Sequence, residues 1–119
     1  MARTIALVDG RAQSVAESRL RVRLVANGIP VPVPQHPVMV PSGRILHPDL
    51  AWPEYRVGLE YDGRWHGRAE QLHLDRQRLN QLTAAGWVIL HATSARLAND
   101  FSGLLRELRT ALRSRGWPG

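Results

Sequence analysis

The sequence lacks two residue types entirely, because it contains neither cysteine nor lysine. Without cysteine, the protein has no disulfide framework and no thiolate metal site. It also lacks any run of about 18 apolar residues, the length that a membrane helix requires. The first ten residues, MARTIALVDG, show neither the apolar segment nor the cleavage site of a signal peptide. These absences predict a cytoplasmic protein with no membrane partner.

The positive charge is carried by arginine alone, with 16 arginines against 10 acidic residues and a net charge of +6. Guanidinium groups bind phosphate through a planar pair of donors, so an arginine surplus favours a polyanionic partner. Arginine in place of lysine is also what a GC-rich genome would encode. Composition alone therefore leaves nucleic acid as an open alternative.

A chain of 119 residues is long enough for one domain with one core. We predict an N-terminal arm over residues 1–13 and a single domain over residues 14–116. The domain begins with a helix in which Ser14 is the N-cap and Glu17 completes a capping box. Gly28 is suited to end this helix.

The remaining pattern predicts a mixed sheet flanked by helices. Expected strands cover residues 33–40, 44–52, 56–62 and 87–93, and expected helices cover residues 69–85 and 99–116. The prolines of the first strand favour a sheet edge, whereas the apolar segment 87–93 favours the middle of the sheet. The order α-β-β-β-α-β-α predicts an α/β fold with a four-stranded mixed sheet.

Three carboxylates are expected on one face of the hairpin formed by the second and third strands. If the turn is centred on residues 53 and 54, Asp49 lies opposite Gly58, and the two-residue period places Glu60 and Asp62 on the same face. Three such charges repel one another unless a cation neutralises them. Hard carboxylate oxygens favour Mg²⁺ or Mn²⁺ as the cofactor.

A carboxylate-bound divalent cation in an arginine-rich protein indicates phosphodiester hydrolysis. His66 follows Asp62 by four residues, beyond the flexible Gly63. It is therefore a candidate to accept a proton from the attacking water or to complete the metal shell.

The segment HPDLAWPEYRVGLEYDGRWHG, followed by LDRQRLNQLTAAGWVILHAT, resembles the PD-(D/E)XK nuclease superfamily. It is most similar to small endonuclease-like domains related to the very-short-patch repair endonuclease, which also occur at the C-terminus of AbiEi-type antitoxins. The resemblance runs from about residue 14 to residue 115. It implies a restriction-endonuclease-like fold for nearly the whole chain.

The resemblance also implies roles for individual residues. Asp49 corresponds to the aspartate of the PD motif, and Glu60 corresponds to the acid of (D/E)XK. Asp62 stands where the superfamily usually has lysine, as a ligand or a water-orienting group, and Glu17 matches a helix acid that many members direct at the metal. The role of the missing lysine then passes to His66, Arg64 or Arg78.

Candidate nucleic-acid contacts lie on both later helices and beside the motif. They are Arg64, Gln71, Arg78, Arg106, Arg109 and Arg113. For Gln71 and Arg78, which share a helix face with Asp75, the alternative is an ordinary surface pair. For the arginines of the last helix, the alternative is a solvated face. Gln35 is either close to the site or simply a polar residue of an edge strand.

These features predict a Mg²⁺-dependent DNA endonuclease or nickase. The alternative is a nuclease-derived DNA-binding module, such as an antitoxin or repressor domain, with little or no cleavage. A third interpretation is an interaction module within a larger assembly. Cleavage of both DNA strands would require a homodimer or a second site.

Overall fold

The computed structural model describes residues 15–62 and 69–119, without the side chains of residues 62 and 69–75. The chain divides into two compact units, Met1–Val31 and Pro32–Gly119. In the first unit, residues 15–26 form the predicted helix. Gly28 ends it with a φ of +86°, and the N–H of Ile29 donates to the carbonyl of Leu24 at 3.1 Å.

The second unit contains a four-stranded mixed sheet with the order β1-β4-β5-β6. Its strands are β1 (Val33–Pro34), β4 (Leu50–Trp52), β5 (Val57–Asp62) and β6 (Val88–Thr93). β1, β4 and β5 pair in antiparallel fashion, whereas β5 and β6 are parallel. The prediction of an α/β fold with a four-stranded mixed sheet is confirmed.

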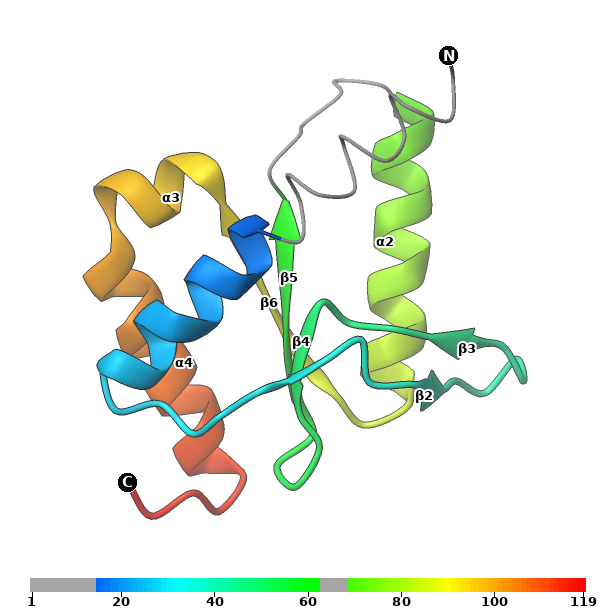
Figure 1. The fold of residues 1–119 in the computed structure, drawn as a ribbon. Helices are drawn as coiled ribbons and strands as arrows, with labels where there is room; N and C mark the ends of the chain where they lie inside the picture. The colour runs from blue at the N-terminus through cyan, green and yellow to red at the C-terminus, as the bar shows by residue number, and fades with distance from the viewer. Residues whose placement is uncertain (1–14, 63–68) are drawn as a thin grey trace. The chain divides into compact units, whose positions relative to one another are not determined.

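Helices flank this sheet on both sides. They are α2 (Ala69–Ala84), α3 (Ser94–Asn99) and α4 (Phe101–Ser114). α2 connects the two parallel strands and lies on one side of the sheet, whereas α3 and α4 lie on the other (Figure 1). α3 was not among the predicted helices; Thr93 caps it by accepting a hydrogen bond from the N–H of Arg96 at 3.0 Å.

Two of the predicted strands are wrong, because each is interrupted in the structure and forms two short strands. The segment 33–40 breaks into β1 and β2 (Val38–Met39), and the segment 44–52 breaks into β3 (Ile45–Leu46) and β4. β2 and β3 form a separate two-stranded sheet. The first break begins at Gln35, whose φ of +52° is incompatible with a strand, and the second contains Pro48, which has no N–H to donate.

The predicted position of the segment 87–93 is also wrong, because β6 is an edge strand in the order of the described sheet. Its first three residues, Val88 to Leu90, are only half-buried. Helices from both sides pack on β6, so its apolar composition is explained by contact with α2, α3 and α4.

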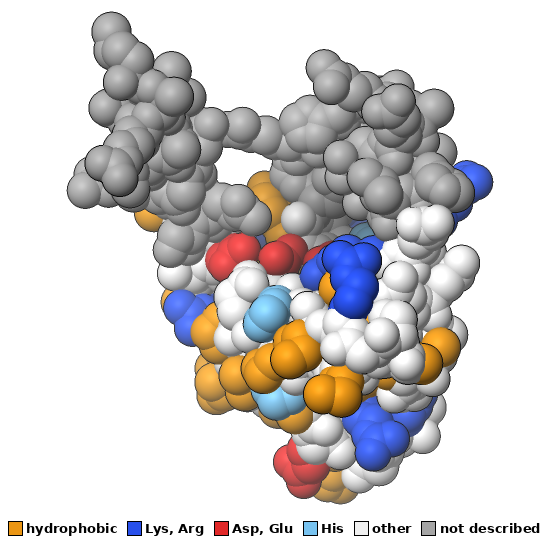
Figure 2. All heavy atoms as spheres, turned by 90° about the vertical axis from the view of Figure 1, so that its right-hand side faces the viewer, with side chains coloured by type: hydrophobic (Ala, Val, Ile, Leu, Met, Phe, Trp, Pro, Cys, Tyr) orange, Lys and Arg blue, Asp and Glu red, His pale blue; other side chains and the backbone are white. Residues whose placement is uncertain are grey.

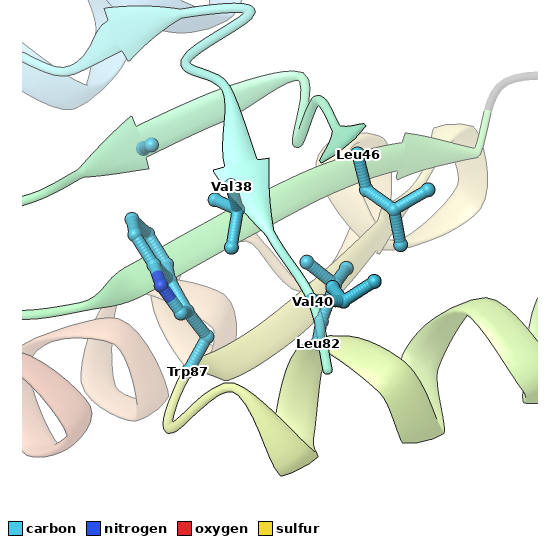
Figure 3. Packing of buried hydrophobic residues seen from close by; sticks show 6 residues of the cluster. Val38, Val40, Leu46, Leu82 and Trp87 are labelled. Atoms are coloured by element: carbon cyan, nitrogen blue, oxygen red, sulfur yellow. The ribbon is translucent and has the colours of Figure 1, made fainter. Parts of the chain in front are cut away.

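A hydrophobic cluster joins α2 to the face of the sheet that also carries the β2–β3 hairpin (Figure 3). Its buried members are Val38, Val40, Leu46, Ala51, Leu82 and Trp87. Gly86 ends α2 with a φ of +88°, a conformation that favours glycine, and the N–H of Trp87 donates to the carbonyl of Leu82 at 3.1 Å. This turn directs Trp87 into the cluster.

Candidate functional site

The β4–β5 hairpin carries the two central acids of the predicted site. Its register pairs Leu50 with Leu59 and Ala51 with Gly58, so the predicted pairing of Asp49 with Gly58 is wrong by two residues. The turn is longer than expected, because residues 53–56 all lie between the strands and Arg56 has a φ of +53°. A shift of two residues preserves the face of each side chain and brings Asp49 level with Glu60.

Asp49 directly precedes Leu50, the first residue of β4, and its carboxylate makes a further contact with β5. Its Oδ2 accepts a hydrogen bond from the backbone N–H of Tyr61 at 2.7 Å. Gln35 also contacts this residue: its Nε2 donates to Oδ1 at 3.5 Å and its N–H donates to the Asp49 carbonyl at 3.2 Å. Asp49 is therefore held from both sides, by Tyr61 of β5 and by Gln35, which directly follows β1.

Glu60 forms an ion pair with Arg78, which reaches it from α2. The Glu60 side chain is 14% exposed and the Arg78 side chain 31%. The Nη2 of Arg78 also donates to the carbonyl of His47 at 2.9 Å. Burial lowers the pKa of Arg78, and the charge of Asp49 opposes this effect by raising it. The guanidinium is thus partly desolvated and lies within the field of both acids.

This arrangement belongs to the face of the molecule that carries α2. On that face, acidic and basic side chains meet above the apolar surface (Figure 2). Asp49, Glu60 and Arg78 come from the end of a loop, a strand and a helix, so three elements converge at one point.

Several predicted site residues fall outside this description. Arg64 and His66 belong to residues 63–68, and the side chains of Asp62 and Gln71 are likewise outside the described part of the chain. The backbone of Asp62 ends β5 and pairs in register with Thr93. Glu17 lies in the helix of the first unit.

The predicted arginine face of the last helix lies on α4, across the sheet from Arg78 (Figure 1). Arg106 is exposed and Arg109 half-buried. Arg113 donates to the carbonyl of Gly119 at 2.8 Å and lies 5.9 Å from the centre of the Trp117 ring. The α4 arginines therefore do not contribute to the site around Glu60.

One neighbour of Glu60 was not predicted from the sequence. His91 is its register partner on β6 and is exposed. Directly paired residues of neighbouring strands point to the same face of a sheet, so His91 shares the face of Glu60. A parallel alignment of VGLEYD with VILHAT pairs Glu60 with His91. This alignment can be made only when the register between the two strands is known.

The donor atoms present fit a hard divalent cation. Asp49 and Glu60 supply carboxylate oxygens, and Mg²⁺ sites commonly use one or two carboxylates together with water and substrate phosphates. Within the described residues, no group of three or more histidine, cysteine, aspartate or glutamate side chains is close enough to hold a metal. Of the four predicted metal ligands, Asp49 and Glu60 have described side chains in the second unit, whereas the side chain of Asp62 lies outside the description and Glu17 belongs to the first unit.

The Asp49 carboxylate should also contribute to stability. In Asp49→Ala the N–H of Tyr61 loses its acceptor, which should lower the free energy of unfolding by about 1–3 kcal/mol. Asp49→Asn keeps a side-chain oxygen that can accept this bond, so its loss should be smaller. Urea unfolding without metal measures both variants, and equal losses would show that the Tyr61 bond does not stabilise the hairpin.

Comparisons with known proteins give a limited result. No family model matches the chain, and no solved structure matches it. The chain is similar to two proteins of Mycobacterium tuberculosis, "Uncharacterized protein MT2308" from strain CDC 1551 / Oshkosh and "Uncharacterized protein Rv2248" from strain H37Rv. Each is 35% identical over 83 residues, which cover 69% of this chain and 31% of the relative.

The chain thus spans about 31% of the length of these relatives, whose names attribute no activity to them. None of the helices in residues 15–62 and 69–119 has the length and apolar character needed to cross a membrane.

Proposed function

We propose that this protein is a metal-dependent DNA endonuclease or nickase that hydrolyses phosphodiester bonds. The observation that supports it most is that Arg78 brings the two acids into one site: its guanidinium forms an ion pair with Glu60 and lies within the field of Asp49. Carboxylates for a cation and an arginine for phosphate are the groups that this reaction requires. The motifs that resemble PD-(D/E)XK nucleases include the same two acids.

Each residue has a distinct part in the proposed reaction. Asp49 and Glu60 would hold Mg²⁺ or Mn²⁺, which polarises the phosphoryl oxygen and activates water. The Tyr61 N–H fixes the Asp49 carboxylate in position. Asp62 would add a ligand or orient the water. His66 would accept the proton of the attacking water.

A second candidate function is a DNA-binding module with little or no turnover. It is favoured by the pairing of Glu60 with Arg78, which already neutralises one proposed ligand, and by the absence of lysine from the chain. Such a module would bind DNA through arginine–phosphate contacts, with an affinity that falls steeply as salt increases.

Incubation of the purified protein with supercoiled plasmid separates the two functions. The endonuclease proposal predicts relaxed or linear plasmid in Mg²⁺ or Mn²⁺ and none in EDTA. Binding to a labelled duplex, measured at several salt concentrations in parallel, shows whether DNA is a partner at all. Salt-dependent binding without cleavage in either metal would replace the endonuclease by the binding module, and a single-stranded RNA control tests the choice of nucleic acid.

A further inference from the structure

We propose that Arg78 is a built-in counter-cation of Glu60 that a metal ion must displace, and that the displaced guanidinium then binds the substrate phosphate. This inference rests on the proposed function. It makes Arg78 a substrate-binding residue whose partner changes when the metal binds. It also couples metal binding to phosphate binding through a single side chain.

The surroundings of Glu60 require a counter-charge. Its side chain is only 14% exposed, and it lies on the face of the sheet that packs against α2 through Ala51 and Leu82. A carboxylate so little hydrated is costly unless a cation pairs with it. Among the described residues, Arg78 is a cation that pairs with it, since its guanidinium contacts Glu60 Oε1.

The second contact of Arg78 allows it to change partner without leaving the site. Its Nη1 faces Glu60, whereas its Nη2 donates to the carbonyl of His47, two residues before Asp49. A guanidinium has five N–H donors in a fixed plane. The bond to His47 can therefore persist while the edge that faces Glu60 turns to another oxyanion.

Arg78 and a metal ion cannot both bind the Glu60 carboxylate without weakening one of the two contacts, because the two cations repel each other. A divalent cation bound to Glu60 and a guanidinium in contact with the same carboxylate repel each other, because the effective dielectric constant near a protein surface is well below that of water. Since the metal must contact the carboxylate oxygens directly, the arginine contact is the one that weakens. A phosphate group brought in by the substrate then offers Arg78 a bidentate acceptor.

The test is a calorimetric titration of the whole protein with Mn²⁺, without nucleic acid. Arg78→Met removes the competitor, so Mn²⁺ should bind at least about tenfold more tightly than in the wild type. Arg76→Met is the matched control, because Arg76 is an exposed arginine two residues away on the same helix. Its Mn²⁺ affinity should stay within about twofold of the wild type.

Two further variants are controls: one tests whether loss of the His47 contact disturbs the fold, and the other tests whether the effect of Arg78 requires Glu60. Arg78→Gln keeps a donor for the His47 carbonyl and should also bind Mn²⁺ more tightly, and circular dichroism confirms that each variant is folded. In a Glu60→Gln background, Arg78→Met should no longer raise Mn²⁺ affinity, because the carboxylate for which arginine and metal compete is absent.

The outcomes distinguish this inference from the proposed function. Wild-type binding of Mn²⁺ with equal or weaker binding in Arg78→Met overturns the exchange and leaves the metal-dependent function intact. An equal gain in Arg76→Met would reveal a general effect of charge and also overturns the exchange. Absence of Mn²⁺ binding in every variant overturns both proposals.

Discussion

Replacing Glu60 with glutamine should lower the rate of plasmid cleavage by roughly a thousandfold or more. The substitution keeps the size of the side chain but removes the charge that would hold the metal next to the phosphate. Metal stabilisation of the transition state is worth several kcal/mol, and each 1.36 kcal/mol corresponds to a factor of ten in rate. The measurement is the initial rate of nicking at saturating Mg²⁺.

Glu54→Gln is the matched control for this experiment. Glu54 is an exposed glutamate in the turn of the same hairpin, at the end opposite Asp49. This variant should cleave at a rate close to that of the wild type. If Glu60→Gln folds normally and still cleaves within a factor of about ten of the wild type, Glu60 does not hold a catalytic metal.

The second large effect is expected for His66→Ala, which should lose about 10² to 10⁴ in cleavage rate while DNA affinity stays almost unchanged. A general base acts in the transition state and contributes little to ground-state binding. Because the chain has no lysine, an imidazole is its best candidate to activate water.

His91→Ala is the comparison variant, because it tests whether another imidazole acts as the general base. His91 is the register neighbour of Glu60, so it is the other imidazole with a structural claim to the role. We expect its removal to change the rate by less than about tenfold. A large loss in His91→Ala with normal cleavage in His66→Ala would transfer the role of general base to β6. A shifted Mg²⁺ requirement in His66→Ala would instead indicate a metal ligand.

Local patterns predicted most of the helices and the long strand β5. The helix at residues 15–26 and α2 both follow apolar repeats that end at a glycine, Gly28 and Gly86. The short strands were not predictable in this way. Their breaks depend on the backbone of Gln35 and on the pairing of β2 with β3 in a separate sheet, and neither follows from composition.

The prediction that Asp49 and Glu60 lie on the same face came from the two-residue period of a strand. The error in register does not change it, because the register differs by two residues. The ion pair between Glu60 and Arg78 depends on how α2 crosses the sheet, which the sequence alone does not specify. The position of His91 depends on the parallel register of β5 and β6, and these two strands are far apart in the chain. Contacts between distant elements are therefore the part of the site that local patterns could not give.

The most direct test of a metal held by Asp49 and Glu60 is a crystal structure of the protein grown with Mn²⁺ and measured at the manganese absorption edge. The account predicts an anomalous peak within coordination distance of both carboxylates, with the Arg78 guanidinium moved away from Glu60. A peak elsewhere, or no peak at saturating Mn²⁺ with Arg78 still paired to Glu60, would contradict it.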